Sequence, residues 1–247
     1  MIESKLTTVF FDMDGTLVLS EPDNLEIIAD FCAEIGQPLD AETCRRGRRV
    51  RYGYFADPVI REQLTGLSRQ EFWRHFNRHM LEMMGIEGDL DLLAEEMGRR
   101  SAALRMVFSC PEATLGALAE LRTRGYQLGM ITNRENLERF QAQIDELGLR
   151  PYLDLLVAAG EVGASKPSPA IFRAAVERAG VTVEQALHVG DNYWADAQGA
   201  RGAGLHAALI DPYHLFPEAE CLILERLEDL LAWLPGEGGK EQVARDK

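Results

Sequence analysis

The sequence VFFDMDGT, residues 9–16, is an apolar run that ends in two aspartates one residue apart. Side chains alternate between the two faces of an extended segment, so Asp12 and Asp14 are expected on the same face. Two carboxylates held this close repel each other unless a divalent cation or a shared proton offsets their charge. The stretch therefore predicts either a metal site or a carboxyl group with a raised pKa. Asp14-Gly15 is also compatible with a simple turn, because both residue types favour turns for local reasons.

The composition of the chain limits what such a site can serve. At 247 residues the chain is long enough for one large domain, or for a core domain with an insertion. It is 46% hydrophobic and 27% charged, and it has no stretch of about 18 apolar residues that would predict a membrane span. The formal net charge of -14 argues against a nucleic-acid partner, because affinity for phosphate backbones comes mainly from clustered Lys and Arg.

Two further features favour a cytoplasmic protein. The first residues, 1–5, lack the basic start and the apolar stretch of a signal peptide. The cysteines are far apart in the sequence and form no CxxC pair; they are Cys32, Cys44, Cys110 and Cys221. Such a pattern is typical of ordinary thiols in a reducing compartment.

From Val107 onward, short apolar runs alternate with helical patterns. This alternation predicts an α/β fold, with a Rossmann-like parallel sheet covered on both faces by helices. Beyond the first strand, the expected strands are Tyr126–Thr132, Leu153–Ala159, Ala186–Val189 and His206–Ile210. The expected helices are Glu112–Arg124, Asn136–Leu147, Ser168–Gly180, Trp194–Ala203 and Leu224–Leu234.

A long segment with helical periodicity interrupts this pattern after the first strand. We therefore expect an α/β core domain at 1–18 and 106–235, with an all-helical domain inserted at 19–105. The Gly- and charge-rich tail, 236–247, is expected to be disordered.

Polar residues follow three of the expected strands at the point where each strand ends: Asp12 and Asp14, Thr132-Asn133, and Asp191-Asn192. In open α/β sheets ligands bind at the carboxyl ends of the strands, so we expect these groups to converge. Lys166, the one lysine well inside the sequence, precedes an expected helix start and could reach the same edge. Carboxylates, a hydroxyl, a lysine and free amides suit a phosphoryl group bound with Mg²⁺. An ionised Asp beside a metal and a cationic side chain can attack phosphorus and form an acyl phosphate.

These motifs resemble those of the haloacid dehalogenase-like hydrolase superfamily, mainly its phosphatases with a helical cap. Asp12-Met13-Asp14-Gly15-Thr16 is similar to the first motif of that family, and Ile131-Thr132-Asn133 to the second. Lys166-Pro167 is similar to the third, and Gly190-Asp191 with Asp196 to the fourth. All four motifs occur in the family's order.

The resemblance implies a catalytic role for several residues. Asp12 would be the nucleophile, and Asp14 would be the general acid that protonates the leaving oxygen and then the base that activates water. Thr132 and the backbone amide of Asn133 would bind the phosphoryl oxygens. Lys166 would hold the nucleophile and the phosphate in place.

The resemblance also implies a magnesium site. Asp191 would complete this site together with Asp12 and the backbone carbonyl of Asp14. Asp196 would be a partner of Lys166 and not a ligand of the metal. The segment 19–105 would be a cap that closes over the site and excludes water.

Differences between branches of the family favour a phosphatase. The dehalogenases lack an acid at the position of Asp14 and need no Mg²⁺. The segment 19–105 contains no lysine, which excludes the Schiff-base route of phosphonoacetaldehyde hydrolases and weakens an assignment as a sugar phosphomutase. Arginines at five of the positions 45–51 are either a solvated helix face or a binding surface for an anionic leaving group. His188, in an apolar strand, is expected to be a packed residue.

The sequence therefore predicts Mg²⁺-dependent hydrolysis of a small phosphate monoester through an aspartyl-phosphate on Asp12. The expected partner is a small phosphorylated metabolite; phosphoglycolate, a nucleoside monophosphate and a sugar phosphate are all compatible. Two alternatives remain open: a metal-independent 2-haloacid dehalogenase, and a catalytically silent module that binds a phosphorylated metabolite.

Overall fold

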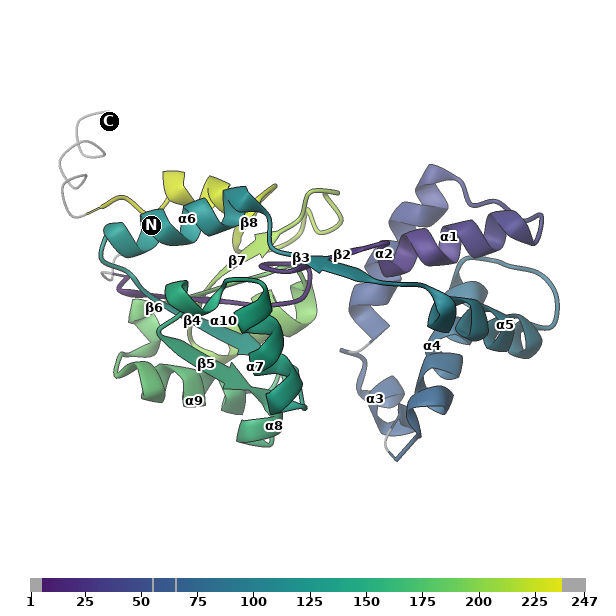
Figure 1. The fold of residues 1–247 in the computed structure, drawn as a ribbon, viewed down its shortest axis with the longest axis horizontal. Helices are drawn as coiled ribbons and strands as arrows, with labels where there is room; N and C mark the ends of the chain where they lie inside the picture. Colours follow the sequence, from purple (N-terminus) through teal and green to yellow (C-terminus); the bar gives the residue numbers. More distant parts are fainter. Residues whose placement is uncertain (1–5, 55, 65, 237–247) are drawn as a thin grey trace. The chain divides into compact units, whose positions relative to one another are not determined.

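The computed structural model describes residues 6–54, 56–64 and 66–236. The chain divides into two compact units, one of Met1–Leu19 with Phe108–Lys247 and one of Ser20–Val107. The first unit is α/β and the second is helical (Figure 1). Among the described residues, no helix combines the length and hydrophobicity needed to cross a membrane. Apart from Gly236, the tail expected to be disordered lies outside the described residues.

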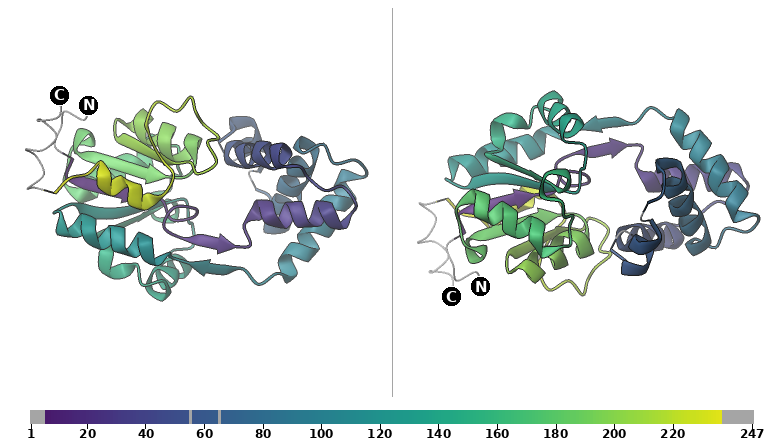
Figure 2. Two further views of the ribbon diagram at one scale, coloured as in Figure 1. Left: turned by 90° about the horizontal axis from the view of Figure 1, so that it is seen from above. Right: turned by 90° about the horizontal axis from the view of Figure 1, so that it is seen from below.

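A parallel sheet forms the centre of the α/β unit. Among the described residues it contains six strands in the order β5-β4-β1-β6-β7-β8, all paired in parallel. The strands are β1 (Thr8–Phe11), β4 (Gln127–Thr132), β5 (Leu155–Ala158), β6 (Ala186–Gly190), β7 (His206–Ile210) and β8 (Leu222–Leu224). The first strand therefore lies inside the sheet, and Figure 2 shows it in purple between green and teal strands. The predicted Rossmann-like α/β fold is confirmed.

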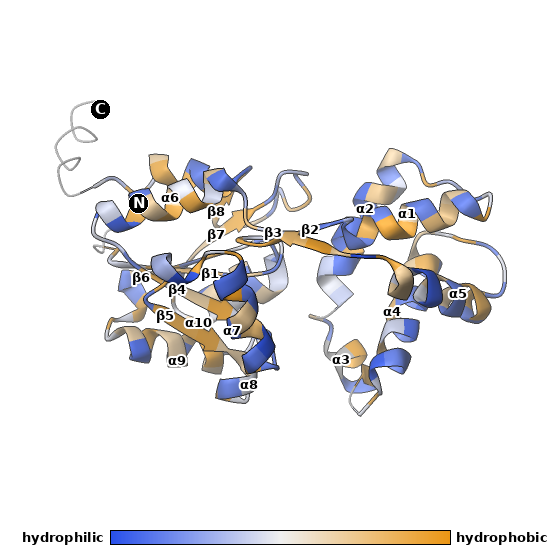
Figure 3. Cartoon of the chain, in the orientation of Figure 1, coloured by the Kyte–Doolittle hydropathy of each residue, from blue (hydrophilic) through white to orange (hydrophobic). Residues whose placement is uncertain are grey.

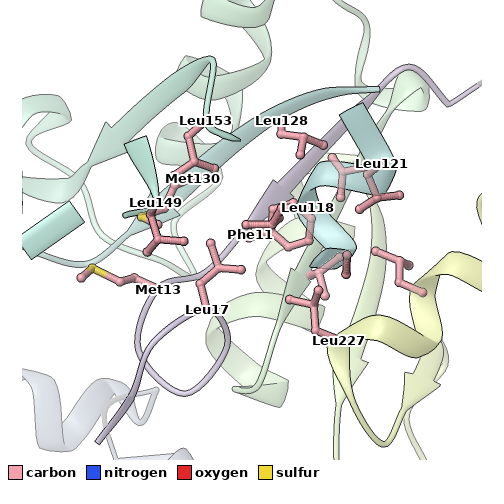
Figure 4. Close-up of a cluster of buried hydrophobic side chains, with 14 of the residues drawn as sticks. Phe11, Met13, Leu17, Leu118, Leu121, Leu128, Met130, Leu149, Leu153 and Leu227 are labelled. Carbon is pink, nitrogen blue, oxygen red and sulfur yellow. The ribbon is translucent and has the colours of Figure 1, made fainter. Parts of the chain in front are cut away.

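Helices cover both faces of this sheet, as α6 and α9 show in Figure 1. On one face the strands pack with α6 (Glu112–Thr123) and α7 (Leu137–Glu146), and Figure 4 shows Phe11 and Leu118 in this cluster. Contacts to the sheet from α9 (Pro169–Ala179) and α10 (Gly199–Ala203) form the other layer. Because both faces are covered, the inner strands are mostly apolar, and all four residues of β1 are buried. The short helix α8 (Ala159–Val162) follows β5.

Two predictions in this unit were wrong in part. The segment Leu224–Leu234, expected to be a helix, begins inside β8 and continues as the 3-10 helix η4 (Leu227–Ala232). Periodicity cannot separate an apolar triplet from a helical turn, and pairing with β7 makes this one a strand. The segment Trp194–Ala203, expected to be one helix, is divided between the π-helix η3 (Tyr193–Gln198), which contains its first half, and α10.

The second unit contains α1 (Asn24–Glu34), α2 (Ala41–Tyr54), α3 (Pro58–Leu64), α4 (Arg69–Met83) and α5 (Leu90–Ala103). These helices bury their own apolar cluster, which includes Phe31 and Met80. Local signals set the helix starts. At α4, for example, Ser68 N–H donates to Glu71 Oε2 at 2.8 Å and Glu71 N–H donates to Ser68 Oγ at 3.3 Å. The role of 19–105 as a cap stays a prediction.

Two short strands, β2 (Leu19–Glu21) and β3 (Val107–Ser109), pair with each other where the chain passes between the units. The expectation that 19–105 is helical throughout was wrong at β2. Backbone pairing between distant segments forms this strand, and helical periodicity cannot reveal it. All three residues of β3 are exposed, although Figure 3 shows the strand as hydrophobic.

Candidate active site at the carboxyl edge of the sheet

Three neighbouring strands bring the predicted polar residues to one edge of the sheet. β1 lies between β4 and β6, with Phe11 in register with Met130 on one side and with Val189 on the other. Residues that follow these strands therefore emerge at the same level. Asp12 is fixed there by its backbone, because its N–H donates to the carbonyl of Val189 at 2.8 Å.

Lys166 joins two carboxylates beneath this edge. Its Nζ lies 2.5 Å from Asp12 Oδ1 and 2.5 Å from Asp196 Oδ1, and its side chain is only 2% exposed. Asp196 also accepts a hydrogen bond from His188 Nε2 at 2.9 Å, and from the N–H of Asn192 at 3.0 Å. Burial lowers the pKa of Lys166, but the two carboxylates outweigh this effect and raise that pKa above its ordinary value. The lysine is therefore a buried cation shared by two acids.

The pKa values of the two acids beside Lys166 shift in opposite directions, although burial acts to raise both. Burial raises the pKa of Asp12; Lys166 opposes this shift, while the neighbouring carboxylates Asp196, Asp191 and Asp14 add to it. Burial also acts to raise the pKa of Asp196, but Lys166 and His188 lower it well below its usual range. More acidic than basic side chains surround Asp12. A further cation beside Asp12 would therefore lower its pKa and favour its ionised form.

A cluster of carboxylates could supply such a cation site. Among the described residues, Asp12, Asp191 and Asp196 each offer an oxygen atom, and these atoms lie within 4.8 Å of one another. Oxygen-only donors of this kind fit Mg²⁺, which prefers carboxylates, carbonyls and water. Asp196 accepts hydrogen bonds on both of its oxygens, from Lys166 and His188 at Oδ1 and from the N–H of Asn192 at Oδ2, so Asp12 and Asp191 are the more suitable ligands.

Two glycines fit the backbone closely around these acids. A Cβ on Gly15 would lie 2.3 Å from Asp191 Oδ2, and one on Gly190 would lie 2.3 Å from Asp196 Cγ. The π-helix η3 begins at Tyr193, shortly after Gly190. Its N-cap residue is Asn192, whose Oδ1 accepts hydrogen bonds from the backbone N–H groups of Trp194 and Ala195 at 3.1 and 3.0 Å. The N–H of Asp196 donates to the carbonyl of Asn192 at 2.8 Å, and this first turn of η3 returns Asp196 to the cluster that contains Asp191.

The second predicted motif holds the lysine loop. Asn133 Oδ1 accepts a hydrogen bond from the N–H of Lys166 at 2.7 Å, and Asn133 Nδ2 donates to the carbonyl of Lys166 at 3.1 Å. The side chain of Asn133 therefore positions Lys166, and only its backbone amide is left for the predicted contact with a phosphoryl group. Thr132, at the end of β4, is buried.

Sequence reasoning missed two side chains at this edge. Arg134 donates from Nε to Asp14 Oδ2 at 2.8 Å and from Nη2 to Asp14 Oδ1 at 2.5 Å. The side chain of Asp14 is thus turned to Arg134, and it lies outside the cluster of three carboxylates. His188 packs edge-on against Phe172, with ring centroids 5.2 Å apart, but it also bonds to Asp196. The position of Arg134 directly after Thr132-Asn133 was the one available signal.

Comparison with known proteins finds similar sequences and structures over most of this chain. The model of the haloacid dehalogenase-like hydrolase family matches residues 6–204. A ribulose-1,5-bisphosphate 5-phosphatase of Halopiger xanaduensis is 30% identical, over 83% of this chain and 85% of that protein. A phosphoglycolate phosphatase of Pseudomonas savastanoi pv. phaseolicola is 30% identical, over 92% of this chain and 78% of that protein. The solved structure of a 2-haloacid dehalogenase from Pseudomonas syringae pv. Tomato is 26% identical, with a TM-score of 0.51, and the match covers 91% of this chain and 96% of that one.

Proposed function

The chain belongs to the haloacid dehalogenase-like hydrolase family, and from this premise we propose that it is a Mg²⁺-dependent phosphatase of small phosphate monoesters. The observation that carries the proposal is the buried Lys166 that contacts Asp12 Oδ1 at 2.5 Å, at the edge where Asp191 also lies. A carboxylate in contact with a fixed cation is oriented for attack on phosphorus. The activities named for the relatives support hydrolysis of a phosphate ester.

In the first half-reaction Asp12 is the nucleophile. A carboxylate oxygen of Asp12 forms a bond to phosphorus while the bond from phosphorus to the ester oxygen breaks. Asp14 begins this step with the proton that it takes from water in the second half-reaction, so that Arg134 holds it through one oxygen only; it gives this proton to the departing oxygen, and the alcohol leaves. Thr132 and the amide of Asn133 bind the phosphoryl oxygens, and Lys166 holds Asp12 in place. The product of this step is an aspartyl-phosphate on Asp12.

In the second half-reaction water replaces the aspartate. Asp14, now ionised, removes a proton from a water molecule, and the water oxygen attacks phosphorus. The bond between phosphorus and Asp12 breaks, which releases inorganic phosphate and restores the carboxylate. Asp12, Asp191 and the backbone carbonyl of Asp14 would hold Mg²⁺, which neutralises charge on the transferring phosphoryl group.

The helical unit completes the proposal as a cap. The predicted role of 19–105 is to exclude water while the ester is cleaved. The expected ligand is a small phosphorylated metabolite, as the names of the relatives also suggest. Free cysteines, Cys32, Cys44, Cys110 and Cys221, suit a reducing compartment and support the expected cytoplasmic location.

A 2-haloacid dehalogenase is the second candidate, because a solved dehalogenase shares this fold. The presence of Asp14 argues against it, since halide needs no proton to leave and the resemblance assigns this acid to phosphatases. A silent binding module is also disfavoured, because binding alone requires neither Asp14 nor a nucleophile in contact with Lys166.

The test is a screen of purified protein against phosphorylated metabolites, with Mg²⁺ or with excess EDTA. The proposal expects phosphate release from at least one ester, and loss of this release in EDTA that is restored by added Mg²⁺. A parallel assay follows halide release from 2-chloropropionate. Full phosphatase activity in EDTA, or halide release without metal, would overturn the proposal.

A further inference from the structure

An arginine to which the proposed mechanism assigns no chemical step lies beside the proposed acid. Arg134 grips both carboxylate oxygens of Asp14, at 2.8 and 2.5 Å. The two residues meet because β1 and β4 are neighbours, so the loops after Phe11 and Thr132 leave the sheet side by side. A guanidinium therefore stands on the side of the site from which Asp14 would protonate the leaving oxygen.

The loop that carries Arg134 is held by contacts of its backbone. The N–H of Arg134 donates to Thr132 Oγ1 at 3.4 Å, and its carbonyl accepts from the N–H of Gly160 at 3.1 Å. Gly160 packs so closely on this loop that a Cβ there would lie 2.0 Å from the carbonyl oxygen of Glu135. The side chain is thus directed by a fixed backbone, and it remains 33% exposed.

The charges at this edge differ in their access to solvent. Lys166 is 2% exposed and lies between two carboxylates, so its charge is shielded from solvent. Arg134 and Asp14 are 33% and 48% exposed, so this ion pair is accessible from solvent. The guanidinium of Arg134 is therefore more accessible to an anionic group in solution than the ammonium of Lys166.

We propose that Arg134 binds a second anionic group on the alcohol part of the substrate. The substrate class is then a phosphate monoester whose alcohol carries a carboxylate or a second phosphate. The inference rests on the proposed function, because it takes Asp14 as the acid that protonates the alcohol oxygen.

One guanidinium can contact Asp14 and bind a substrate anion at the same time. Arginine has five N–H donors in a planar fork. Within the described residues, the contacts of Arg134 use Nε and Nη2, which leaves Nη1 for a further acceptor. A substrate anion bound at Nη1 would bring the ester oxygen close to Asp14. Arg134 would then select the substrate and align it with the acid.

The kinetic test compares two esters that share a two-carbon skeleton. Phosphoglycolate carries a carboxylate, and ethyl phosphate has a methyl group in its place. The wild-type protein should favour phosphoglycolate by at least about tenfold in kcat/KM, and Arg134→Gln should lower this preference about tenfold or more, mainly through KM. Arg134→Lys, which keeps the charge, should restore part of the preference. Arg139→Gln removes an exposed charge five residues further along the chain, and it should leave the preference unchanged.

A binding test needs no turnover. 3-Phosphonopropionate and propylphosphonate are the matching analogues in which a methylene group replaces the ester oxygen. Arg134→Gln should weaken binding of the first about tenfold and change binding of the second by less than about twofold. Equal losses for both analogues, or for both esters, would overturn the inference and show that Arg134 acts on Asp14 alone. A wild-type protein that hydrolyses ethyl phosphate as well as phosphoglycolate keeps the proposed function and loses this inference. A protein that hydrolyses no ester loses the proposed function, while the analogues still test the role of Arg134.

Discussion

Gly15 lies against the carboxylate of Asp191 so closely that a Cβ at this position would be 2.3 Å from Oδ2. Its φ of +87° is also one that residues with a side chain rarely adopt. Gly15→Ala should therefore displace Asp191 and weaken activation by Mg²⁺ about tenfold or more. Backbone strain should lower the free energy of unfolding by about 1–3 kcal/mol. Activity against Mg²⁺ concentration measures the first effect, and urea unfolding measures the second.

Gly125 provides a matched control for this substitution. Its φ is +89°, and a Cβ there would have no atom within 4 Å. Gly125→Ala should lower the free energy of unfolding by a similar amount, because the strain is the same, and it should leave the response to Mg²⁺ unchanged. If both variants respond to Mg²⁺ like the wild-type protein, contact with Gly15 does not fix Asp191.

Because Asp12 and Asp196 share Lys166, we expect substitutions of Lys166 and Asp196 to have coupled effects on stability. Lys166→Met leaves Asp12 and Asp196 buried without their common partner, which should lower the free energy of unfolding by about 3–5 kcal/mol. Adding Asp196→Asn removes one of these charges and should recover at least about 1 kcal/mol. Activity should stay lost in both variants, since Lys166 no longer holds Asp12.

A double-mutant cycle in urea measures this coupling. The variants needed are Lys166→Met, Asp196→Asn and their combination. Additive losses would contradict the prediction, because they would mean that Lys166 and Asp196 contribute independently although their atoms lie 2.5 Å apart.

Local sequence signals were sufficient for the inner strands. A strand within a parallel sheet is a short apolar run bounded by turn residues, and such a run is visible without knowledge of its partners. The strand expected at Tyr126–Thr132 lies at Gln127–Thr132, and that expected at Ala186–Val189 lies at Ala186–Gly190. The edge strand β8 was missed, because only its pairing with β7 distinguishes its three residues from a helical turn.

In the candidate site, too, some features follow from local sequence signals and others depend on the folded structure. Polar residues that follow strands can be found in the sequence, and Thr132, Asp191 and Asp12 were found in this way. Partnerships between side chains depend on tertiary packing. Arg134 pairs with Asp14 across 120 positions of the sequence, and its position directly after Thr132-Asn133 does not identify this partner. His188 was expected to be a packed residue only, and its bond to Asp196 follows from the π-helix that brings that acid back toward β6.

Asp12→Asn should remove turnover without unfolding the protein. The carboxamide has nearly the same shape but cannot form an acyl phosphate, so activity should fall by at least about 1,000-fold. Burial raises the pKa of Asp12, which means that the buried carboxylate is costly and that a neutral side chain is tolerated there. Lys166 keeps Asp196 as its partner. Phosphate release and far-UV circular dichroism measure the two outcomes.

An acid-quench experiment makes this prediction more specific. The wild-type protein, mixed with labelled ester and Mg²⁺ and quenched in acid, should retain label as an aspartyl-phosphate. Asp12→Asn should retain none, and Asp14→Asn, which loses the base for the second step, should retain whatever label it forms for longer. Turnover of Asp12→Asn comparable to that of the wild-type protein would exclude Asp12 as the nucleophile.

The helical unit should lose stability in mild acid through His79. Burial and the neighbouring His75 lower the pKa of His79, and Glu82 and Asp57 offset this only in part. A histidine with a lowered pKa in the folded state binds a proton more readily when the chain is unfolded. Its contribution to stability is therefore complete above the unfolded pKa of about 6.5 and is lost as the pH falls below it.

The measurement is the thermal midpoint of unfolding at about pH 7.5 and about pH 5.5. The thermal midpoint of the wild-type protein should be lower at the lower pH. His79→Gln should make this decrease smaller, because its side chain does not titrate. His214→Asn is the control: His214 is exposed and has a φ of 51°, which Asn tolerates, so this variant should fall as much as the wild-type protein. An acid-induced fall that is equal in all three proteins would assign the sensitivity to groups other than His79.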